Sequence, residues 1–430
     1  MTMIQRVLKS KPLVGEITIP ADKSVSHRAI MFASLAKGRS IISNFSSGAD
    51  CWSTLNAFRA LGVEINEIDS KTIEVVSSGT LKKIFTPLDM GNSGTTTRLI
   101  AGILAGQDFD SVLVGDESLS KRPMKRIIEP LSLMGADIEA VDGHAPLTIR
   151  GRKLQGITYS SKLSSAQVKS CVLLAGLNER TEGKTTYTEP ALSRNHTELM
   201  LKYLGADVEI DRCKTIISPS RLIAKDIEIV GDISSAAFFI VAGLIVEGSN
   251  IVIKNVGVNE TRAGILDIVQ RMGGEVDVFN EREVAGEKVA DIRVQYTDNL
   301  KSCEIFGSDI PRLIDELPVI AVLASQAEGE TVVRDAGDLR NKEADRISCL
   351  VRELRKIGVD IDELPDGFVV RGKGKSNLAG GAELEVYHDH RLAMSFYVAG
   401  LVCEKEIAIK GFEWINISFP EFEGLMTALS

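Results

Sequence analysis

An internal repeat is the feature of this sequence that most constrains its fold. A helix of small and apolar residues, followed by a Gly turn and a β-branched strand, recurs six times. A leucine near the end of each helix marks the period, which is roughly 67 to 79 residues and longer than that of common solenoids. The marker leucines are Leu35, Leu104, Leu177, Leu244, Leu323 and Leu401.

A second helix in each unit ends in a glycine and is followed by a strand, a pattern typical of a helix C-terminus. The turn glycines are Gly62, Gly135, Gly205, Gly273 and Gly358, and the sixth copy ends near the C-terminus. Each unit therefore reads as strand, helix, strand, helix and one or two further strands. The pattern predicts an α/β fold made of six α+β units of the βαβαββ type.

The length of 430 residues predicts two domains, because one hydrophobic core rarely supports a chain of this size. We expect hinges near residues 20–23 and 232–235. Units one to three would then form one domain over residues 23–233. Units four to six would form the other, over residues 1–22 and 234–430.

The composition narrows the class of protein. The six cysteines stand singly, without a spacing suited to zinc or to a disulfide framework, so we expect a reduced, cytoplasmic protein. The longest uncharged apolar run, residues 238–246, is too short to cross a bilayer, and the N-terminus has no leader-like apolar core. The net charge of −9 argues against a nucleic-acid partner. Cations gathered in short motifs favour a small anionic ligand instead.

Cationic motifs stand at helix starts in the first half. In residues 21–28, Ser24 or Ser26 can cap the helix while Lys23 and Arg28 add charge to its N-terminus, which favours an anion site. A capped surface helix is the alternative. The Gly-rich stretch 91–98 lacks the Lys of a Walker A loop and the last Gly of GxSxG. It allows close backbone approach to a ligand, or it is only a structural turn.

Two further motifs of the first half carry polar groups. The loop 115–126 holds four cations, among which Arg122 beside the rigid Pro123 is best shaped to grip a carboxylate or phosphate. A solvated surface is the alternative. Residues 163–169 and 192–196 contain hydroxyls and an amide that could bind sugar-like hydroxyls and a phosphate, although a Ser pair is usually a cap.

The second half supplies carboxylates. Asp315 and Glu316 open the fifth small-residue helix, where a capping carboxylate is the ordinary explanation. In residues 340–346, Lys342 and Arg346 would lie one turn apart on a helix, and a surface ion-pair ladder is the alternative. Residues 387–391 open the sixth helix with HxH, but no further ligand completes a metal site, so we expect no metal. Helix starts from both domains would face one cleft that suits two anionic substrates.

These motifs, taken in order, resemble the enolpyruvyl transferase family, and among its members the EPSP synthases. The resemblance runs from about Gly15 to Pro420 and covers nearly the whole chain. It rests on the ordered set DKSVSHRA, GNSGTTTR, GDESLSKRPM, SSAQVKS, LSRNHTE, GDISSAAFF, IDELP, LRNKEADRI, HDHRLAMSF and SFP. It implies an inside-out α/β barrel of two pseudo-threefold domains that close on the substrates.

The resemblance also implies an activity and a set of site residues. The enolpyruvyl group of phosphoenolpyruvate would pass to the 5-hydroxyl of shikimate 3-phosphate through a tetrahedral intermediate, without a cofactor. Asp315 would be the base, and Glu343 with Lys23 would handle protons at the methylene carbon. Shikimate 3-phosphate would be held by Lys23, Ser24, Arg28, Ser165, Gln167, Ser193, Asp315 and Lys342. Phosphoenolpyruvate would be held by Lys23, Asn92, Gly94, Arg122, Gln167, Arg346 and Arg391.

Two positions of this chain depart from the family pattern, which limits how far the family's site residues can be assigned to it. Asn416 stands where many relatives place a Lys, so one cation at the phosphoenolpyruvate site is missing or replaced. Ala166 stands where some relatives have a second Ser, which weakens one contact to the substrate phosphate. The alternatives are the sister enzyme that acts on UDP-N-acetylglucosamine, whose loop cysteine is absent here, and a non-catalytic repeat scaffold. We expect a monomer acting on small molecules.

Overall fold

The computed structural model describes residues 2–430, which divide into two compact domains. The N-domain comprises Ala21–Val230 and the short segment Glu283–Glu287, and the C-domain comprises the rest. The N-domain thus begins two residues and ends three residues before the limits expected from the repeat. The segment Glu283–Glu287 lies at the turn between two strands of the C-domain and was not anticipated from the sequence.

The N-domain contains the first three units. Its helices are α1 (Lys23–Leu35), α2 (Ala49–Ala60), α3 (Gly94–Ala105), α4 (Glu117–Ser120), α5 (Lys125–Leu133), α6 (Ala166–Leu177) and α7 (His196–Tyr203). Its strands are β3 (Ala36–Ser43), β4 (Glu64–Asp69), β5 (Thr72–Ser78), β6 (Leu88–Asp89), β7 (Ser111–Val114), β8 (Asp137–Val141), β9 (His144–Arg150), β10 (Thr158–Ser160), β11 (Thr185–Thr188), β12 (Val208–Asp211), β13 (Lys214–Ile217), β14 (Leu222–Ile223) and β15 (Ile227–Glu228).

The C-domain contains the last three units. Its helices are α8 (Ile233–Ile245), α9 (Gly264–Arg271), η1 (Gly307–Asp309), α10 (Ile310–Leu313), α11 (Leu317–Ser325), η2 (Gly337–Asn341), α12 (Arg346–Lys356), α13 (His390–Gly400), η3 (Phe412–Ile417) and α14 (Phe422–Leu429). Its strands are β1 (Ile4–Val7), β2 (Val14–Thr18), β16 (Asn250–Gly257), β17 (Glu275–Val284), β18 (Glu287–Gln295), β19 (Glu304–Ile305), β20 (Glu328–Val333), β21 (Ile361–Leu364), β22 (Gly367–Lys373), β23 (Leu378–Gly380), β24 (Glu383–Glu385), β25 (Cys403–Lys405) and β26 (Ile407–Lys410).

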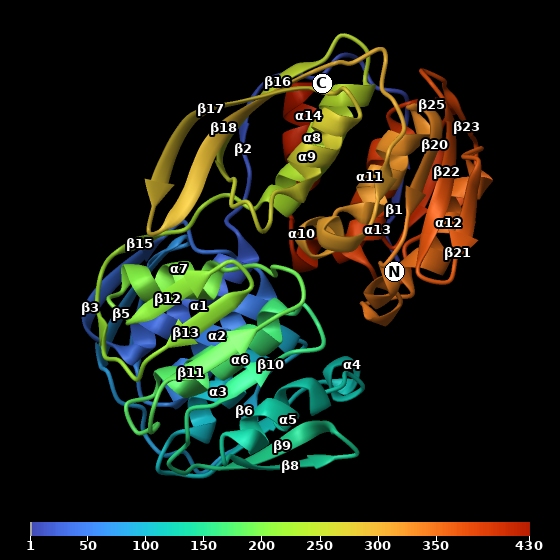
Figure 1. The fold of residues 1–430 in the computed structure, drawn as a ribbon. Helices are drawn as coiled ribbons and strands as arrows, with labels where there is room; N and C mark the ends of the chain where they lie inside the picture. Colours follow the sequence, from blue (N-terminus) through green and yellow to red (C-terminus); the bar gives the residue numbers. More distant parts are fainter. Residues whose placement is uncertain (1) are drawn as a thin grey trace. The chain divides into compact units, whose positions relative to one another are not determined.

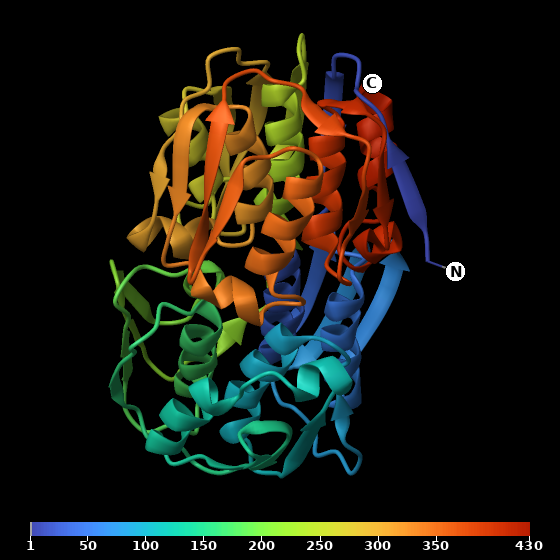
Figure 2. The same cartoon turned by 90° about the vertical axis from the view of Figure 1, so that its right-hand side faces the viewer.

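The small-residue helices form the core of each domain. In the C-domain, α8, α11 and α13 pack against one another (Figure 1), and every residue of α8 and α11 is buried. A helix that is apolar on all sides is stable only when it is enclosed, which explains why these segments lie inside. Figure 2 shows, in orange, strands of the C-domain lying over these helices.

Small residues let the core helices of the N-domain approach closely. Helices α3 and α6 pack together, and a Cβ placed on Gly102 would lie 2.1 Å from the carbonyl oxygen of Cys171. No side chain fits in that space, so glycine is required at this crossing. The small-residue character noticed in the sequence therefore has a packing cause.

The second helices end as the sequence predicts. Each of α2, α5, α7, α9 and α12 is followed by a glycine in the left-handed region, with φ between 78° and 95°. Because only glycine adopts this conformation without strain, it ends the helix and turns the chain into the next strand. The sixth copy is α14, which ends at Leu429.

One strand order recurs in the sheets. A strand pairs in parallel with the strand that follows the core helix, and two antiparallel strands complete the sheet. The orders β6-β7-β9-β8, β10-β11-β13-β12, β2-β16-β18-β17 and β19-β20-β22-β21 all follow this rule. The sheets are separate around the core helices rather than joined in one closed sheet. The predicted α/β class and its repeating units are confirmed.

Two equivalent strands are exchanged between the units that begin the domains. Strand β2 precedes α1 in the chain but pairs in parallel with β16, and β15 precedes α8 but pairs in parallel with β3. In the other four units the corresponding strand stays with its own helix. This exchange places the N-terminal strands in the C-domain.

Candidate active site

The carboxylates of the C-domain gather around Arg346 at the start of α12. Its side chain is 1% exposed, and its Nε lies 2.6 Å from Oδ2 of Asp389. Its Nη2 donates to Glu343 at 2.6 Å, and its Nη1 lies 3.4 Å from Oδ1 of Asp315. Burial alone would lower the pKa of Arg346, but the three carboxylates raise it above its usual value. Arg346 is therefore a permanent cation that orients three acids.

Asp315 is contacted by two cationic side chains besides Arg346. Lys342 Nζ lies 3.3 Å from its Oδ1, and Arg262 Nη1 lies 3.4 Å from its Oδ2. Arg391 Nη1 donates to its backbone carbonyl at 3.2 Å. Nearby positive charge favours the ionised form of a carboxyl group. The arrangement suits a carboxylate that accepts a proton from a substrate.

The backbone around this cluster of carboxylates differs from the sequence-based expectation in two ways. Residues 340–346 do not form one helix, because η2 ends at Asn341, Lys342 is extended and α12 begins only at Arg346. The prediction that Lys342 and Arg346 share a helix face is wrong, yet both reach Asp315. The capping explanation for Glu316 is also wrong, since its side chain makes no cap hydrogen bond. It accepts a hydrogen bond from Ser234 instead.

The first cationic group of the N-domain is Lys23 at the start of α1. Its Nζ lies 3.0 Å from Oδ2 of Asp50 on α2. Burial raises the pKa of Asp50, but Lys23 and other cations outweigh burial and lower it below its usual value. The expected serine cap is wrong, because Asp22 caps α1 by accepting from the amide of Val25 at 2.9 Å. The carboxylate of Asp50 therefore positions the Lys23 ammonium.

The Gly-rich stretch and the cationic loop meet through Asn92. Arg122 Nη2 donates to Oδ1 of Asn92 at 2.5 Å, and Asn92 Nδ2 donates to Asp116 at 2.7 Å. A Cβ on Gly94 would lie 3.3 Å from Nη1 of Arg122. These contacts bring Arg122 to Asn92 and Gly94, although Arg122 follows Asn92 by 30 residues in the chain.

Gln167 joins this group from α6. Arg98 Nη1 donates to Gln167 Oε1 at 2.7 Å, and Gln167 Nε2 donates to Thr95 Oγ1 at 3.0 Å. Ser165 is the N-cap residue of the same helix but makes no side-chain cap bond. The amide of Gln167 is thereby oriented by two residues of the Gly-rich stretch, which indicates a site at the starts of α3 and α6.

Ser193 and Arg28 are buried rather than exposed. Lys169 donates to the carbonyl of Ser193 at 3.1 Å, and Glu189 accepts from its amide at 2.9 Å. Ser193 is 2% exposed, and its hydroxyl makes no hydrogen bond with the described residues. Arg28 donates to Thr197 at 2.7 Å, to Ser170 at 3.0 Å and to the carbonyl of Ser24 at 2.9 Å. Through these three hydrogen bonds, Arg28 connects the start of α1 to α6 and α7.

Several residues that shape these clusters were not found from the sequence. Asp50, Arg98, Lys169, Arg262 and Asp389 each orient a predicted site residue through a side-chain contact. Arg98 belongs to the Gly-rich stretch 91–98 but was not predicted as a site residue. The others gave no local signal, because each contact joins segments that are distant in the chain.

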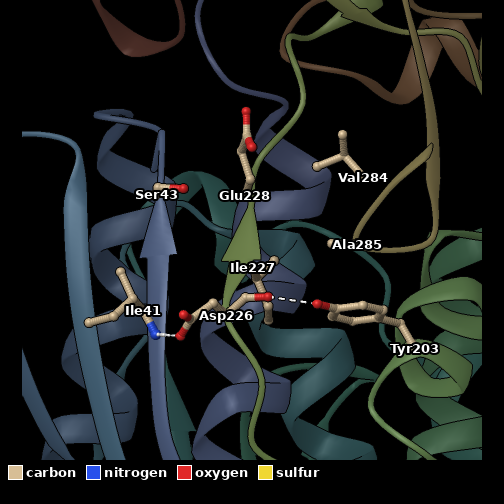
Figure 3. Close-up of a pocket in the computed structure, with 8 residues that line it drawn as sticks. All are labelled: Ile41, Ser43, Tyr203, Asp226, Ile227, Glu228, Val284 and Ala285. Carbon is tan, nitrogen blue, oxygen red and sulfur yellow. Dashed lines mark hydrogen bonds between the residues drawn. The ribbon is translucent and has the colours of Figure 1, made fainter. Parts of the chain in front are cut away.

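A pocket of about 370 Å³ lies elsewhere in the N-domain. Tyr203 donates to the carbonyl of Asp226 at 2.9 Å, and Asp226 accepts from the amide of Ile41 at 2.8 Å (Figure 3). The lining residues are Ile41, Ser43, Tyr203, Asp226, Ile227, Glu228, Val284 and Ala285. None of them is a predicted site residue, so this pocket is not the candidate active site.

Residues 2–430 contain neither a metal-binding cluster nor a membrane-spanning helix. No three His, Cys, Asp or Glu side chains in this range are grouped so that they could hold a metal ion. Within the same residues, every helix falls short of the length and apolar character needed to cross a membrane.

Comparison with known proteins gives consistent matches. The family model for EPSP synthase (3-phosphoshikimate 1-carboxyvinyltransferase) matches residues 7–426. The 3-phosphoshikimate 1-carboxyvinyltransferase of Thermoanaerobacter sp. (strain X514) is 51% identical, over 97% of each chain. That of Thermodesulfovibrio yellowstonii is 49% identical, over 98% of this chain and 99% of the relative.

A solved structure agrees with these sequence matches. The EPSP synthase of Acinetobacter baumannii superposes with a TM-score of 0.91 at 42% identity, covering 100% of this chain and 98% of that one. The resemblance inferred from the motifs is confirmed over nearly the whole length. On these grounds the chain belongs to the EPSP synthase family, the 3-phosphoshikimate 1-carboxyvinyltransferases.

Proposed function

We propose that this enzyme transfers the enolpyruvyl group of phosphoenolpyruvate to the 5-hydroxyl of shikimate 3-phosphate and releases phosphate. The family assignment supports this activity. The observation that carries the mechanism is Asp315, a carboxylate with cationic nitrogens 3.3 to 3.4 Å from its two oxygens. We assign Asp315 as the base that takes the proton from the attacking hydroxyl.

The addition step needs an acid as well as a base. As the hydroxyl oxygen attacks C2 of phosphoenolpyruvate, C3 takes up a proton and becomes a methyl group in the tetrahedral intermediate. We assign Glu343 and Lys23 to this proton transfer. Elimination then removes a proton from the methyl group and expels phosphate. These steps use only side chains of the chain itself.

Cations stabilise the charges of phosphoenolpyruvate during these steps. Phosphate and carboxylate groups are held best by arginine, which offers two parallel donors. We assign Arg122, Arg346 and Arg391 to this role, with Lys23 as a further cation. The neutral contacts are assigned to Asn92, Gly94 and Gln167, which the N-domain brings together.

Shikimate 3-phosphate brings a phosphate, a carboxylate and hydroxyls. We assign its phosphate to the starts of α1 and α6 and to the buried Ser193, whose hydroxyl has no hydrogen bond within the described residues. The ring is assigned to Asp315 and Lys342. The full proposed set is Lys23, Ser24, Arg28, Ser165, Gln167, Ser193, Asp315 and Lys342. We propose that the enzyme works as a cytoplasmic monomer.

A steady-state assay tests the activity. Release of phosphate from phosphoenolpyruvate should depend on shikimate 3-phosphate and should not occur with UDP-N-acetylglucosamine. The reverse acceptor preference would overturn the proposal, and the absence of turnover with either would favour a scaffold.

A variant tests the assignment of the base. Asp315→Asn should retain binding of both substrates but lose at least about 100-fold in kcat, because general-base catalysis typically contributes that much. Asp362→Asn is the matched control, since Asp362 is a half-exposed aspartate of the same domain that pairs with Arg355 and Arg371. Its turnover should equal that of the wild type. Wild-type turnover in Asp315→Asn would place the base elsewhere.

A further inference from the structure

Arg262 is a buried arginine to which the proposed mechanism gives no role. It lies in the loop before α9, and only 4% of its side chain is exposed. Its Nη2 donates to Ser234 Oγ at 2.6 Å and lies 3.3 Å from Oδ1 of Asp232. Its Nη1 lies 3.4 Å from Oδ2 of Asp315. One guanidinium therefore connects the start of α8 to the segment that opens α11.

The connection extends to the neighbour of Asp315. Ser234 donates its hydroxyl hydrogen to Glu316 while it accepts from Arg262. Glu316 is buried, and Arg391 Nη1 lies 3.6 Å from its Oε1. Asp315 is thus contacted directly by Arg262, and Glu316 is linked to Arg262 through Ser234 of α8. Such a network restricts how the backbone and side chain of Asp315 can move.

The two oxygens of Asp315 face different cations. Oδ2 faces Arg262, while Oδ1 faces Lys342 and Arg346. Among the other charged groups, Asp232 shares Arg262, and Asp389 and Glu343 share Arg346. Arg391 contacts the backbone carbonyl of Asp315 and the side chain of Glu316. Arg262 thus supplies positive charge at Oδ2, as Lys342 and Arg346 do at Oδ1.

We propose that Arg262 is a positioning residue for Asp315, which holds Oδ2 in place and keeps the carboxylate ionised for proton abstraction. This inference rests on the proposed role of Asp315 as the base. Arg262 acts through Asp315 and touches no substrate in this scheme. A purely structural role, in which Arg262 only neutralises Asp232 and fills the core, predicts different kinetics.

The charge effect gives the first readout. Removing a cation next to a carboxylate raises its pKa, so a larger fraction of Asp315 is protonated and inactive at low pH. In Arg262→Gln, the acidic limb of the kcat profile should move up by about one pH unit. A structural defect lowers the fraction of active enzyme equally at all pH values and leaves the limb in place.

The orientation effect gives the second readout. A misplaced catalytic group can cost about 100-fold in rate, so kcat of Arg262→Gln at high pH should fall by a factor of that order. Arg262→Lys keeps the charge but loses the planar fork. Its acidic limb should stay near that of the wild type, while kcat falls by about tenfold. KM for phosphoenolpyruvate should change by less than about threefold in both variants, because Arg262 is not among the residues proposed to bind that substrate.

The controls separate this inference from the proposed function. Arg312→Gln removes another arginine of the C-domain, which contacts Asp267 at 2.6 Å and the carbonyl of Glu260 at 2.6 Å. Its pH profile should match the wild type. If Asp315→Asn remains active, the assignment of the base fails and this inference fails with it. If Asp315→Asn is inactive but a folded Arg262→Gln has wild-type kcat and an unmoved acidic limb, only the inference is overturned. If Arg262→Gln does not fold, a kcat of Arg262→Lys within twofold of the wild type overturns it.

Discussion

Arg346 and Asp389 form a buried ion pair in the C-domain, with 2.6 Å between Nε and Oδ2 and side chains that are 1% and 0% exposed. Asp389 is also the N-cap residue of α13, where it accepts from the amides of Arg391 and Leu392. The pair therefore joins the start of α12 to the start of α13. Its carboxylate has two tasks, charge compensation and helix capping.

Asp389→Asn separates these two tasks, because asparagine caps a helix about as well as aspartate but carries no charge. Removing one partner of a buried ion pair typically costs about 3 to 5 kcal/mol, since the remaining charge stays buried. Glu343 and Asp315 still face Arg346, so we expect the lower end, about 3 kcal/mol, in chemical denaturation. Asp345→Asn is the control, as a half-exposed N-cap aspartate paired with Arg340. It should lose less than about 1 kcal/mol, and equal losses would contradict the argument.

Gly94→Ala should weaken binding of phosphoenolpyruvate more than it weakens the fold. The new Cβ would lie 2.8 Å from Nη1 of Arg98 and 3.3 Å from Nη1 of Arg122. Both atoms end flexible side chains, so they can move aside at little cost in stability. Their displacement should raise KM for phosphoenolpyruvate by about tenfold, which corresponds to about 1.4 kcal/mol of binding.

The control for this change is Gly424→Ala. Gly424 lies in α14, and a Cβ added there would meet no heavy atom within 4 Å beyond its chain neighbours and the backbone of its own helix. Its substitution should leave KM unchanged and stabilise the helix by up to about 1 kcal/mol. A Gly94→Ala enzyme with wild-type KM in initial-rate assays would contradict the proposed contact of Gly94 and Arg122 with phosphoenolpyruvate.

The pair formed by Lys23 and Asp50 predicts a dependence of stability on pH. Burial raises the pKa of Asp50, but Lys23 and other nearby cations together outweigh burial, so the pKa is lowered in the folded protein. A group with a lowered folded-state pKa stabilises the protein above its unfolded pKa, and this contribution is lost as the pH falls through the folded value. The difference in unfolding free energy between wild type and Asp50→Asn should therefore be present at pH 7 and shrink progressively as the pH falls below the usual aspartate pKa near 3.8. A difference that is constant between about pH 3 and pH 7 would contradict it.

The fold could be predicted where its signals are local. The small-residue helices and the glycines that end the second helices recur along the sequence, because each unit must bury one helix and turn after the other. Gly62 and Gly358 are examples, with φ of 84° and 95°. The exchange of β2 and β15 could not be predicted in this way. Each of these strands pairs with a partner far away in the chain, and neither carries a signal for that partner.

In the candidate site, too, features with a local sequence signal could be predicted, whereas contacts between distant segments could not. The family resemblance predicts Asp315, Glu343 and Arg346 as site residues, and the structure places all three in one cluster. The prediction that a serine caps α1 was wrong. Aspartate and serine are nearly equivalent N-cap residues, and the sequence offers both at the start of this helix. The role of Arg262 could not be seen, because its contact with Asp315 spans 53 residues and its own segment resembles any polar loop before a helix.

Lys169→Met tests whether a buried charge cluster holds the proposed phosphate contact. Lys169 Nζ lies 2.8 Å from Oε1 of both Glu189 and Glu198, and these three side chains are 1% exposed. Lys169 and Glu189 also bond to the carbonyl and amide of Ser193, which fixes that residue on both sides. The substitution leaves two buried carboxylates without this cation, so the free energy of unfolding should fall by about 3 to 5 kcal/mol.

The kinetic consequence should be selective for one substrate. Without its anchor, Ser193 should bind the phosphate of shikimate 3-phosphate less well, raising KM for that substrate by about tenfold, while KM for phosphoenolpyruvate changes by less than about threefold. Lys184→Met is the control, because Lys184 is a 58% exposed lysine of the same domain that lies 3.6 Å from Glu209. It should change neither KM. Among the ion pairs of the described residues, Lys169 is the only cation within 4 Å of Glu189, so this substitution removes the cation that holds the cluster together. A folded Lys169→Met enzyme with both KM values unchanged would show that substrate binding does not depend on Ser193 being held by this cluster.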